Sequence, residues 1–368
     1  MNDVKYKDLV RTLTREILGG KFVPLGAFPS ERALAMRFKL SRLTVRRAVK
    51  ELARMGLLYS RQGRGTFLTK SGANLRETVG LILTGERRTE IGREVREEVE
   101  RLAGRMGLSL CFGDASAIDS RAGAEASVRL AKKLAAAKVS GVIVQPVEFL
   151  PNAEEVNRKI VSVFAAERIP VVLIDCDIVM PPNRSAYDVV GIDNFQAGRA
   201  LAEHLRAQGA KDVLFVAQSD YPQTISERLR GVRSVFPRKS SRHDVVLKDL
   251  SVSTLSGALK GRKVPQAIVC QNDIAAVKAL AALKQNGLEV PRDVLLAGFD
   301  DVAYAPLMEP SLTSVRQPCK HIAERAFDLL MARIGKSSAP AEFVSVSTSL
   351  VIRQSTVRGR SGKSGIYH

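Results

Sequence analysis

The hydrophobic pattern changes character about seventy residues into the chain. Before that point, apolar residues recur with the period of a helix in three segments, 6–17, 31–38 and 42–55. Two short apolar runs, 57–60 and 65–68, then flank a glycine-bearing turn and predict a β-hairpin. Three helices followed by a hairpin are typical of a winged helix-turn-helix domain.

After this part, apolar runs of strand length alternate with helix-length periodic segments. Such strands, buried on both faces and separated by helices, predict an α/β fold with a doubly wound parallel sheet. The runs form two series, which predicts two similar lobes. The first series is 78–85, 108–113, 141–146 and 170–175, and the second is 189–193, 212–217, 244–250, 267–271 and 294–299.

The positive charge is concentrated in the first part of the chain. The formal net charge is +19, and residues 1–72 carry 16 Lys and Arg against 5 Asp and Glu, a net charge of +11. The much longer stretch 73–357 carries a net charge of only +5. A small basic domain on a nearly neutral body indicates a polyanion as its partner, although a basic face can also be merely solvated.

Other features restrict the class of protein. No apolar run reaches the roughly eighteen residues of a membrane-spanning helix, and the first residues lack the apolar core of a secretory signal, so no membrane partner is expected. Phosphate-loop, HExxH and GxSxG motifs are absent, so we expect no enzyme, no catalytic residue, no metal and no cofactor. The cysteines are far apart and are expected to be reduced in a cytoplasmic protein: Cys111, Cys176, Cys270 and Cys319.

The third predicted helix carries a basic face opposite its apolar stripe. Arg42 and Arg46 are four residues apart, so both guanidinium groups project from the same side. In a helix-turn-helix unit the third helix lies in the DNA major groove, with its N-terminal residues at the base edges. A guanidinium group binds guanine or phosphate there through paired hydrogen bonds. The alternative is a solvated face on a core helix.

The same stretch carries a family resemblance. The DNA-binding domain of GntR-type bacterial transcription regulators is similar to PSERALAMRFKLSRLTVRRAVKELARMGLLYSRQGRGTFL at 29–68, and the resemblance extends over about 5–69. It implies binding of double-stranded operator DNA by a dimer on inverted repeats. It also implies DNA contacts from helix residues Arg32, Ser41, Arg42, Thr44 and Arg46, and from wing residues Gln62, Gly63 and Arg64.

Polar residues follow several predicted strands of the body, namely Thr84, Gln145, Asp175, Asn272, Asp273, Asp300 and Asp301. Ligands of open parallel sheets bind beyond the carboxyl ends of the strands, and buried acceptors there favour a polar guest. Capping of the next helix is an equally good interpretation for Asp193, Asn272 and Asp273. Asp175 precedes a proline-rich segment instead, which favours a ligand role for it.

The body resembles the effector domain of LacI/GalR-type regulators, a fold shared with periplasmic sugar-binding proteins. The resemblance covers about 78–356 and is clearest in 189–217, 226–236, 271–318 and 349–356. It implies a small-molecule effector, a sugar or sugar derivative, held between the lobes. The positions that match ligand contacts of the family are Thr84, Asp175, Arg228, Asn272, Asp300 and Gln317. Arg228 suits the role because its fork of donors can hold adjacent hydroxyl groups beside carboxylates.

We therefore expect a cytoplasmic transcription regulator, associated with the nucleoid when bound to DNA, that acts as a homodimer. Its GntR-type head replaces the helix-turn-helix and hinge helix of LacI/GalR-type proteins, as in arabinose-repressor-like regulators. Two alternatives stay open: a regulator whose vestigial cleft serves only dimerisation, and a solute-binding protein. The predicted domains are the winged helix-turn-helix at 1–69, a linker at 70–77, the two-lobed effector-binding and dimerisation domain at 78–356, and a disordered basic tail at 357–368.

Overall fold

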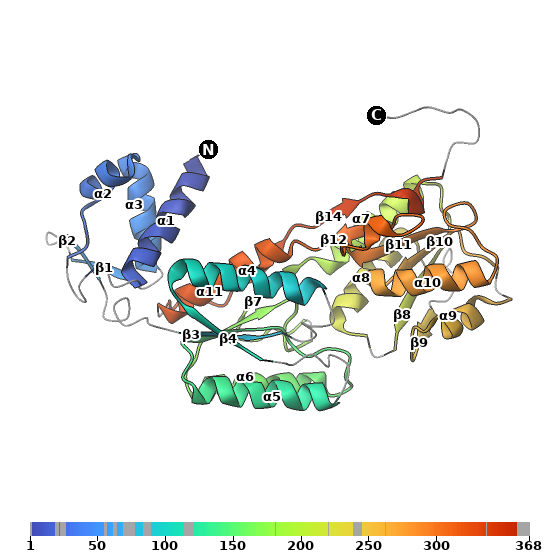
Figure 1. Ribbon diagram of the computed structural model, residues 1–368, viewed down its shortest axis with the longest axis horizontal. Helices are drawn as coiled ribbons and strands as arrows, with labels where there is room; N and C mark the ends of the chain where they lie inside the picture. The colour runs from blue at the N-terminus through green and yellow to red at the C-terminus, as the bar shows by residue number, and fades with distance from the viewer. Residues whose placement is uncertain are drawn as a thin grey trace. The chain divides into compact units, whose positions relative to one another are not determined.

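The computed structural model divides the chain into two compact units (Figure 1). The first comprises Met1–Gly191 and Cys319–Val344, and the second comprises Ile192–Pro318 and Ser345–His368. The structure describes residues 2–18, 22, 27–54, 57–61, 65–68, 78–83, 90–113, 121–180, 182–219, 221–237, 245–261, 263–335 and 337–358. The predicted linker, the wing residues 62–64 and most of the predicted tail lie outside these residues.

The first unit begins with the predicted winged helix-turn-helix, which we call the head. It contains α1 (Asn2–Leu18), α2 (Glu31–Phe38), α3 (Arg42–Arg54) and the antiparallel strands β1 (Leu58–Arg61) and β2 (Gly65–Leu68). Ser30 and Ser41 begin α2 and α3, because their hydroxyl groups accept hydrogen bonds from the amides of Ala33 and Thr44, each over 3.2 Å. The three helices enclose a small core of fully buried side chains: Leu13, Leu34, Val45, Ala48 and Leu52.

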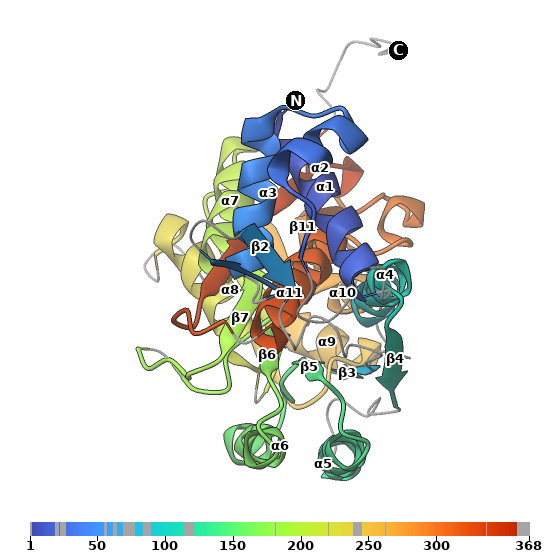
Figure 2. The ribbon, with the colours of Figure 1, turned by 90° about the vertical axis from the view of Figure 1, so that its left-hand side faces the viewer.

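The rest of the first unit is a sheet covered on both faces, which we call lobe 1. Helices α5 (Arg121–Ala136) and α6 (Ala153–Ala166) cover one face, and α4 (Glu90–Met106) and α11 (Cys319–Ile334) cover the other (Figure 2). The strand order is β13-β7-β6-β5-β3-β4. The strands are β3 (Thr78–Ile82), β4 (Ser109–Phe112), β5 (Gly141–Val144), β6 (Val171–Ile174), β7 (Asp188–Ile192) and β13 (Phe343–Val346).

The second unit, lobe 2, repeats this architecture. Its strand order is β14-β12-β11-β10-β8-β9, and only the β12–β14 pair is antiparallel among the pairs described. The strands are β8 (Val213–Gln218), β9 (Val245–Leu247), β10 (Ala267–Cys270), β11 (Leu295–Asp300), β12 (Thr313–Arg316) and β14 (Ser349–Val351). Separate apolar clusters bury α7 (Asn194–Ala207) and α8 (Gln223–Val235) on one face, and α9 (Val252–Leu259) and α10 (Asp273–Gln285) on the other. Two short 3-10 helices, η2 (Ala305–Leu307) and η3 (Gln354–Thr356), complete the unit.

The predicted doubly wound fold is confirmed, but the division of strands between the lobes was wrong. The sequence pattern places the run 189–193 in the second series, whereas β7 pairs with β6 in the sheet of lobe 1. Helix α11 and strand β13 also return to lobe 1 after the chain has built most of lobe 2. The chain therefore crosses three times, at Gly191/Ile192, Pro318/Cys319 and Val344/Ser345. An apolar run indicates a buried strand, but it carries no information on which sheet buries it.

Candidate functional site

The DNA-binding candidates of the head lie at the start of α2 and α3. Arg32 and Arg42 are exposed, and Arg46 is 59% exposed while its Nε lies 3.1 Å from an oxygen of Glu31. An exposed ion pair of this kind contributes roughly 0–1 kcal/mol, so a DNA phosphate can replace Glu31 at little cost. The structure thus presents these three arginines to solvent, as a DNA interface requires.

The two predicted hydroxyl residues are partly committed to the helix itself. The Oγ of Ser41 accepts from the amide of Thr44 and lies 2.8 Å from the hydroxyl oxygen of Thr44. Either hydroxyl can still contact a phosphate, since a hydroxyl oxygen has two lone pairs. The remaining candidates, Gln62, Gly63 and Arg64, lie outside the described residues.

Two features of α3 were not predicted from the sequence. Leu43 lies between Arg42 and Thr44 in the first turn and is 77% exposed, although it is a large apolar residue. Arg47, which the charge pattern places on the basic face, lies 4.3 Å over the ring of Tyr6 in α1. The sequence does contain a signal for the exposure of Leu43, because this apolar residue falls outside the buried stripe of the helix.

In lobe 2, a buried arginine lies at the carboxyl ends of the strands. Arg228 of α8 is 4% exposed, and its Nε donates to the side-chain oxygen of Asn194 over 2.9 Å. Its Nη1 donates to the backbone oxygen of Gln271 over 2.8 Å, directly after β10. The guanidinium carbon lies 4.7 Å from the ring centre of Phe299, which is itself 1% exposed. The ring of Phe299 therefore supports the guanidinium group of Arg228 and does not offer a face on which a ligand could stack.

Two more predicted residues join this arginine. Asp300, at the end of β11, has an oxygen 3.7 Å from Nη1 of Arg228. The amide nitrogen of Gln317 donates to the same oxygen of Asp300 over 2.8 Å. The result is a set of donors and acceptors held in fixed positions beside the ends of β10 and β11. We call Arg228, Asp300 and Gln317 the lobe 2 polar cluster.

Asn272 lies one residue after Gln271 and begins α10. Its side-chain oxygen accepts from the amide of Ala275 over 2.9 Å, and Asp193 caps α7 in the same way through Gln196. Capping is therefore confirmed for both, and it uses only the oxygen of Asn272. Its amide nitrogen can still donate to a ligand.

Asp273 does not cap a helix, which corrects that interpretation. It is fully buried, and its two oxygens accept from the hydroxyl of Ser314 over 2.7 Å and from the amide of Val302 over 3.1 Å. Burial, with the nearby charge of Asp300, raises the pKa of Asp273 to about 8 despite these hydrogen bonds. Asp273 therefore holds the loop after β11, and its burial favours the protonated form.

Asp301 is likewise structural. Its two oxygens lie 2.6 Å from Arg316 and 2.6 Å from Arg353, and its side chain is 1% exposed. This paired carboxylate ties β12 to the chain after β14. Of the two neighbouring aspartates, only Asp300 therefore belongs to the lobe 2 polar cluster.

In lobe 1, Asp175 lies at the end of β6 with a φ of 74°. The amide nitrogen of Gln145, which follows β5, is 3.4 Å from an oxygen of Asp175. A side chain at Gly191 of β7 would approach the backbone oxygen of Asp175 to 2.6 Å, so only glycine fits beside this turn. The predicted strand-end residues of lobe 1 thus meet each other, while Thr84 lies outside the described residues.

The structure adds Asn194 and Gln271 as residues that hold Arg228. No pattern in the sequence distinguishes them, because each occupies an ordinary position beside a helix start. Among the described residues, no group of His, Cys, Asp and Glu is arranged to hold a metal ion. None of the described helices has the length and apolar character needed to cross a membrane.

Comparisons with known proteins agree with both parts of the chain. Residues 5–68 match the model of bacterial regulatory proteins of the gntR family, and residues 202–356 match that of the periplasmic binding protein-like domain. The chain is 28% identical to the arabinose metabolism transcriptional repressor of Geobacillus stearothermophilus, over 96% of this chain and 97% of the repressor. It is 24% identical to the HTH-type transcriptional repressor PurR of Histophilus somni (strain 129Pt), over 77% and 82% of the two chains.

Solved structures show the same fold for the body. A LacI family transcriptional regulator from Enterococcus faecalis with bound ribose superposes with a TM-score of 0.65 at 22% identity, over 77% of this chain and all of that one. A periplasmic binding protein/LacI transcriptional regulator from Alkaliphilus metalliredigens, complexed with D-xylulofuranose, gives a TM-score of 0.62 at 23% identity with similar coverage.

Proposed function

We propose that a sugar or sugar derivative controls the operator affinity of this chain. The chain is a transcriptional repressor that joins a gntR-type helix-turn-helix domain to a periplasmic-binding-protein-like effector domain. The family resemblance and fold class predicted from the sequence are confirmed. The expectation of a regulator and not an enzyme agrees with the named relatives, which are transcriptional repressors.

The lobe 2 polar cluster supports an effector of this class. Arg228 is fixed by Asn194 and Gln271, so its remaining donors stay beside the acceptor Asp300 without any rearrangement. Alternating fixed donors and acceptors match adjacent hydroxyl groups, each of which donates and accepts. Asp175 in lobe 1 is the proposed contact from the other unit. Contacts from both units would link effector binding to a shift between conformations of the regulator.

The exposed arginines of the head support the DNA-binding arrangement. We assign Arg42 and Arg46 to base edges or phosphates of the major groove, and Arg32 to the backbone. Ser41 and Thr44 are assigned to phosphate contacts, and the wing residues to the adjacent minor groove. Thr84 keeps its proposed role at the effector.

An apolar patch on lobe 2 supports the proposed homodimer. Ile274 and Val277 of α10 are 42% and 39% exposed, and Leu307 of η2 is 82% exposed. The amide of Val302 donates to Asp273, which brings the segment that contains η2 to the start of α10. A second copy would bury this patch. Val277→Glu should shift sedimentation toward the monomer, whereas Val246→Glu, on the exposed edge strand β9, should not.

Thermal unfolding of the full chain with D-ribose, D-xylulose, L-arabinose and related sugars tests the effector. A sugar at about a hundred times its dissociation constant stabilises the folded protein by roughly 2.7 kcal/mol, so the midpoint rises measurably. The rise should disappear in Arg228→Ala and persist in Arg230→Ala, since Arg230 is exposed on the same helix and pairs with Glu227.

The alternatives give different results. A vestigial cleft predicts no response to any sugar in the wild-type protein, together with intact operator binding. A solute-binding protein predicts a sugar response but no preference for specific over random double-stranded DNA. Either result would contradict the proposed function.

A further inference from the structure

Helix α11 is buried on more sides than its own sheet explains. Leu329, Leu330, Met331 and Ala332 are all no more than 6% exposed, and four consecutive residues cover most of the circumference of a helix. Leu330 faces the sheet, where its Cδ1 would lie 2.7 Å from a side chain placed at Gly141. The flanking Leu329 and Met331 therefore pack on neighbours other than the sheet, one of which is α4 on the same face.

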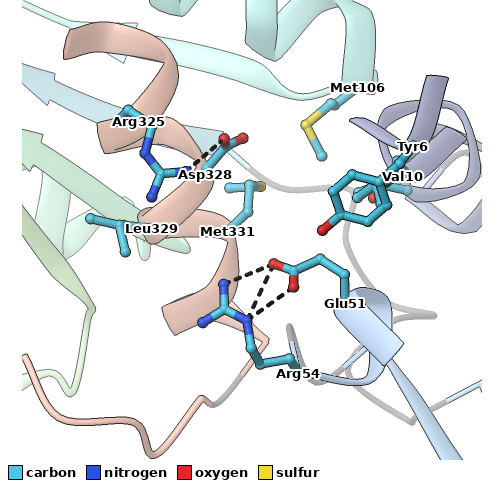
Figure 3. Close-up of a pocket in the computed structure, with 10 residues that line it drawn as sticks. Tyr6, Val10, Glu51, Arg54, Met106, Arg325, Asp328, Leu329 and Met331 are labelled. Carbon is cyan, nitrogen blue, oxygen red and sulfur yellow. Dashed lines mark hydrogen bonds and ion pairs between the residues drawn. The ribbon is translucent and has the colours of Figure 1, made fainter. Parts of the chain in front are cut away.

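The head is another such neighbour, because Leu329 and Met331 line one pocket together with residues of α1 and α3 (Figure 3). Tyr6 and Val10 of α1 face Met106 of α4 and Met331 of α11 across a pocket of about 110 Å³. Val10 and Tyr6 are half-buried, although they lie beside and not within the core of the head. Apolar side chains of two domains thus share one small cavity, which lies within the first unit.

A charged connection runs beside the pocket. Arg54, in the last turn of α3, pairs with Glu51 over 2.8 Å and lies 3.9 Å from Glu342. The backbone amide of Glu342 donates to Asp188 over 2.8 Å. Asp188 in turn accepts two hydrogen bonds from Arg333 of α11, over 2.6 and 2.7 Å. The C-terminal end of the DNA-binding helix is therefore connected to α11 and β7.

These contacts lie close to the points at which the chain passes between the units. Asp188 precedes the crossover at Gly191/Ile192, and Glu342 precedes the crossover at Val344/Ser345. Helix α11 begins at the remaining crossover, at Cys319. The segments that contact the head are therefore continuous in sequence with these crossovers.

We propose that docking of the head on α4 and α11 is the coupling element of this regulator, so that the head and lobe 1 move as one body. The N-terminal end of α3 stays free in the docked arrangement, since Arg42 and Leu43 are exposed, and docking is therefore compatible with DNA binding. For its effect on DNA, this inference rests on the proposed function.

A fluorescent reporter tests the docking without DNA. The chain contains no Trp, so Tyr6→Trp places a single Trp in the pocket of the full chain. In this background, Val10→Glu puts a carboxylate into the pocket and should shift the emission to longer wavelength and increase quenching by the neutral quencher acrylamide. Thr12→Glu is the matched control, because Thr12 is also half-buried on α1 but does not line the pocket.

A partner substitution separates undocking from unfolding. Met106→Lys, in lobe 1, leaves the head sequence intact and should give the same shift alone. The double variant Val10→Glu/Met106→Lys places opposite charges in one pocket and should restore the emission of the parent. Unchanged emission in both single variants, or equal shifts in Val10→Glu and Thr12→Glu with no restoration by Met106→Lys, would overturn the docking.

DNA affinity then tests the coupling. The probe is double-stranded DNA that the wild-type protein enriches from a random pool, compared with the unselected pool. Undocked heads occupy a broader range of positions, so the second head of a dimer reaches its half-site less often. Val10→Glu should therefore weaken binding to enriched DNA by about tenfold or more and leave the affinity for random DNA nearly unchanged. Wild-type affinity in an undocked variant would refute the coupling. Failure of the wild-type protein to enrich any DNA would count against the proposed function alone.

Discussion

Replacement of Arg228 by methionine should destabilise lobe 2 by an amount that the hydrogen bonds define. The substitution keeps most of the side-chain volume over Phe299 but removes the donors to Asn194 and to the backbone oxygen of Gln271. Each buried acceptor left without a partner costs about 1–3 kcal/mol. The free energy of unfolding should therefore fall by about 2–6 kcal/mol. Gln317 still donates to Asp300, which limits the loss at that carboxylate.

Urea unfolding followed by circular dichroism measures this loss, with Arg230→Met as an exposed control on the same helix. A second substitution sharpens the test: Asn194→Leu removes one of the stranded acceptors, and replacing both partners by apolar groups is close to neutral. Arg228→Met/Asn194→Leu should therefore recover about 1–3 kcal/mol relative to Arg228→Met. A loss below about 1 kcal/mol in Arg228→Met, or no recovery in the double variant, would show that Arg228 is not held by these bonds.

Three further predictions concern single positions. Asp273 has a pKa of about 8 in the folded protein, against 3.8 in the unfolded chain, so the folded state binds one more proton between these pH values. The stability of the protein should therefore fall as pH rises through that window. Asp273→Asn should flatten the dependence of the melting temperature on pH, and an unchanged slope in this variant would refute the prediction. Leu43→Ala should weaken specific DNA binding only where a thymine methyl is present, so replacing dT by dU at one position should cost the wild-type protein affinity and leave the variant unaffected. Arg42→Ala should lose about 1–3 kcal/mol on specific DNA, and equal losses on random DNA would identify Arg42 as a phosphate contact.

The head could be predicted almost completely from the sequence. Each of its helices combines an apolar stripe with a polar start, and Ser30 and Ser41 cap α2 and α3 as expected. Its hairpin is marked by glycines between two apolar runs. These signals are local, so they do not depend on the rest of the chain.

The fold class of the body could be predicted from the sequence, but the assignment of its strands and helices to the two lobes could not. The short strands β12, β13 and β14 were missed, because TSVR at 313–316 has a single apolar residue and because FVSV at 343–346 and SLV at 349–351 are too short to be distinguished from loops. The crossing of β7 and α11 into lobe 1 depends on long-range pairing, which periodicity does not encode. The same holds for the polar cluster, because the support of Arg228 by Asn194 and Gln271 exists only after α7, α8 and β10 have packed together.

The triple crossing of the chain bears on how the protein is made. During synthesis lobe 2 has nearly all of its residues before α11 leaves the ribosome, whereas lobe 1, which begins far earlier in the chain, still lacks that helix and β13. On one face of the lobe 1 sheet α4 is already present, but the area around Gly141 that α11 covers stays open until then. The head meets the α11 side of its pocket only at the same late stage, although Met106 of α4 is translated earlier. The part of the protein that is translated first is therefore the last to reach its final surroundings, and chains truncated before residue 319 should carry a folded head on an incomplete lobe.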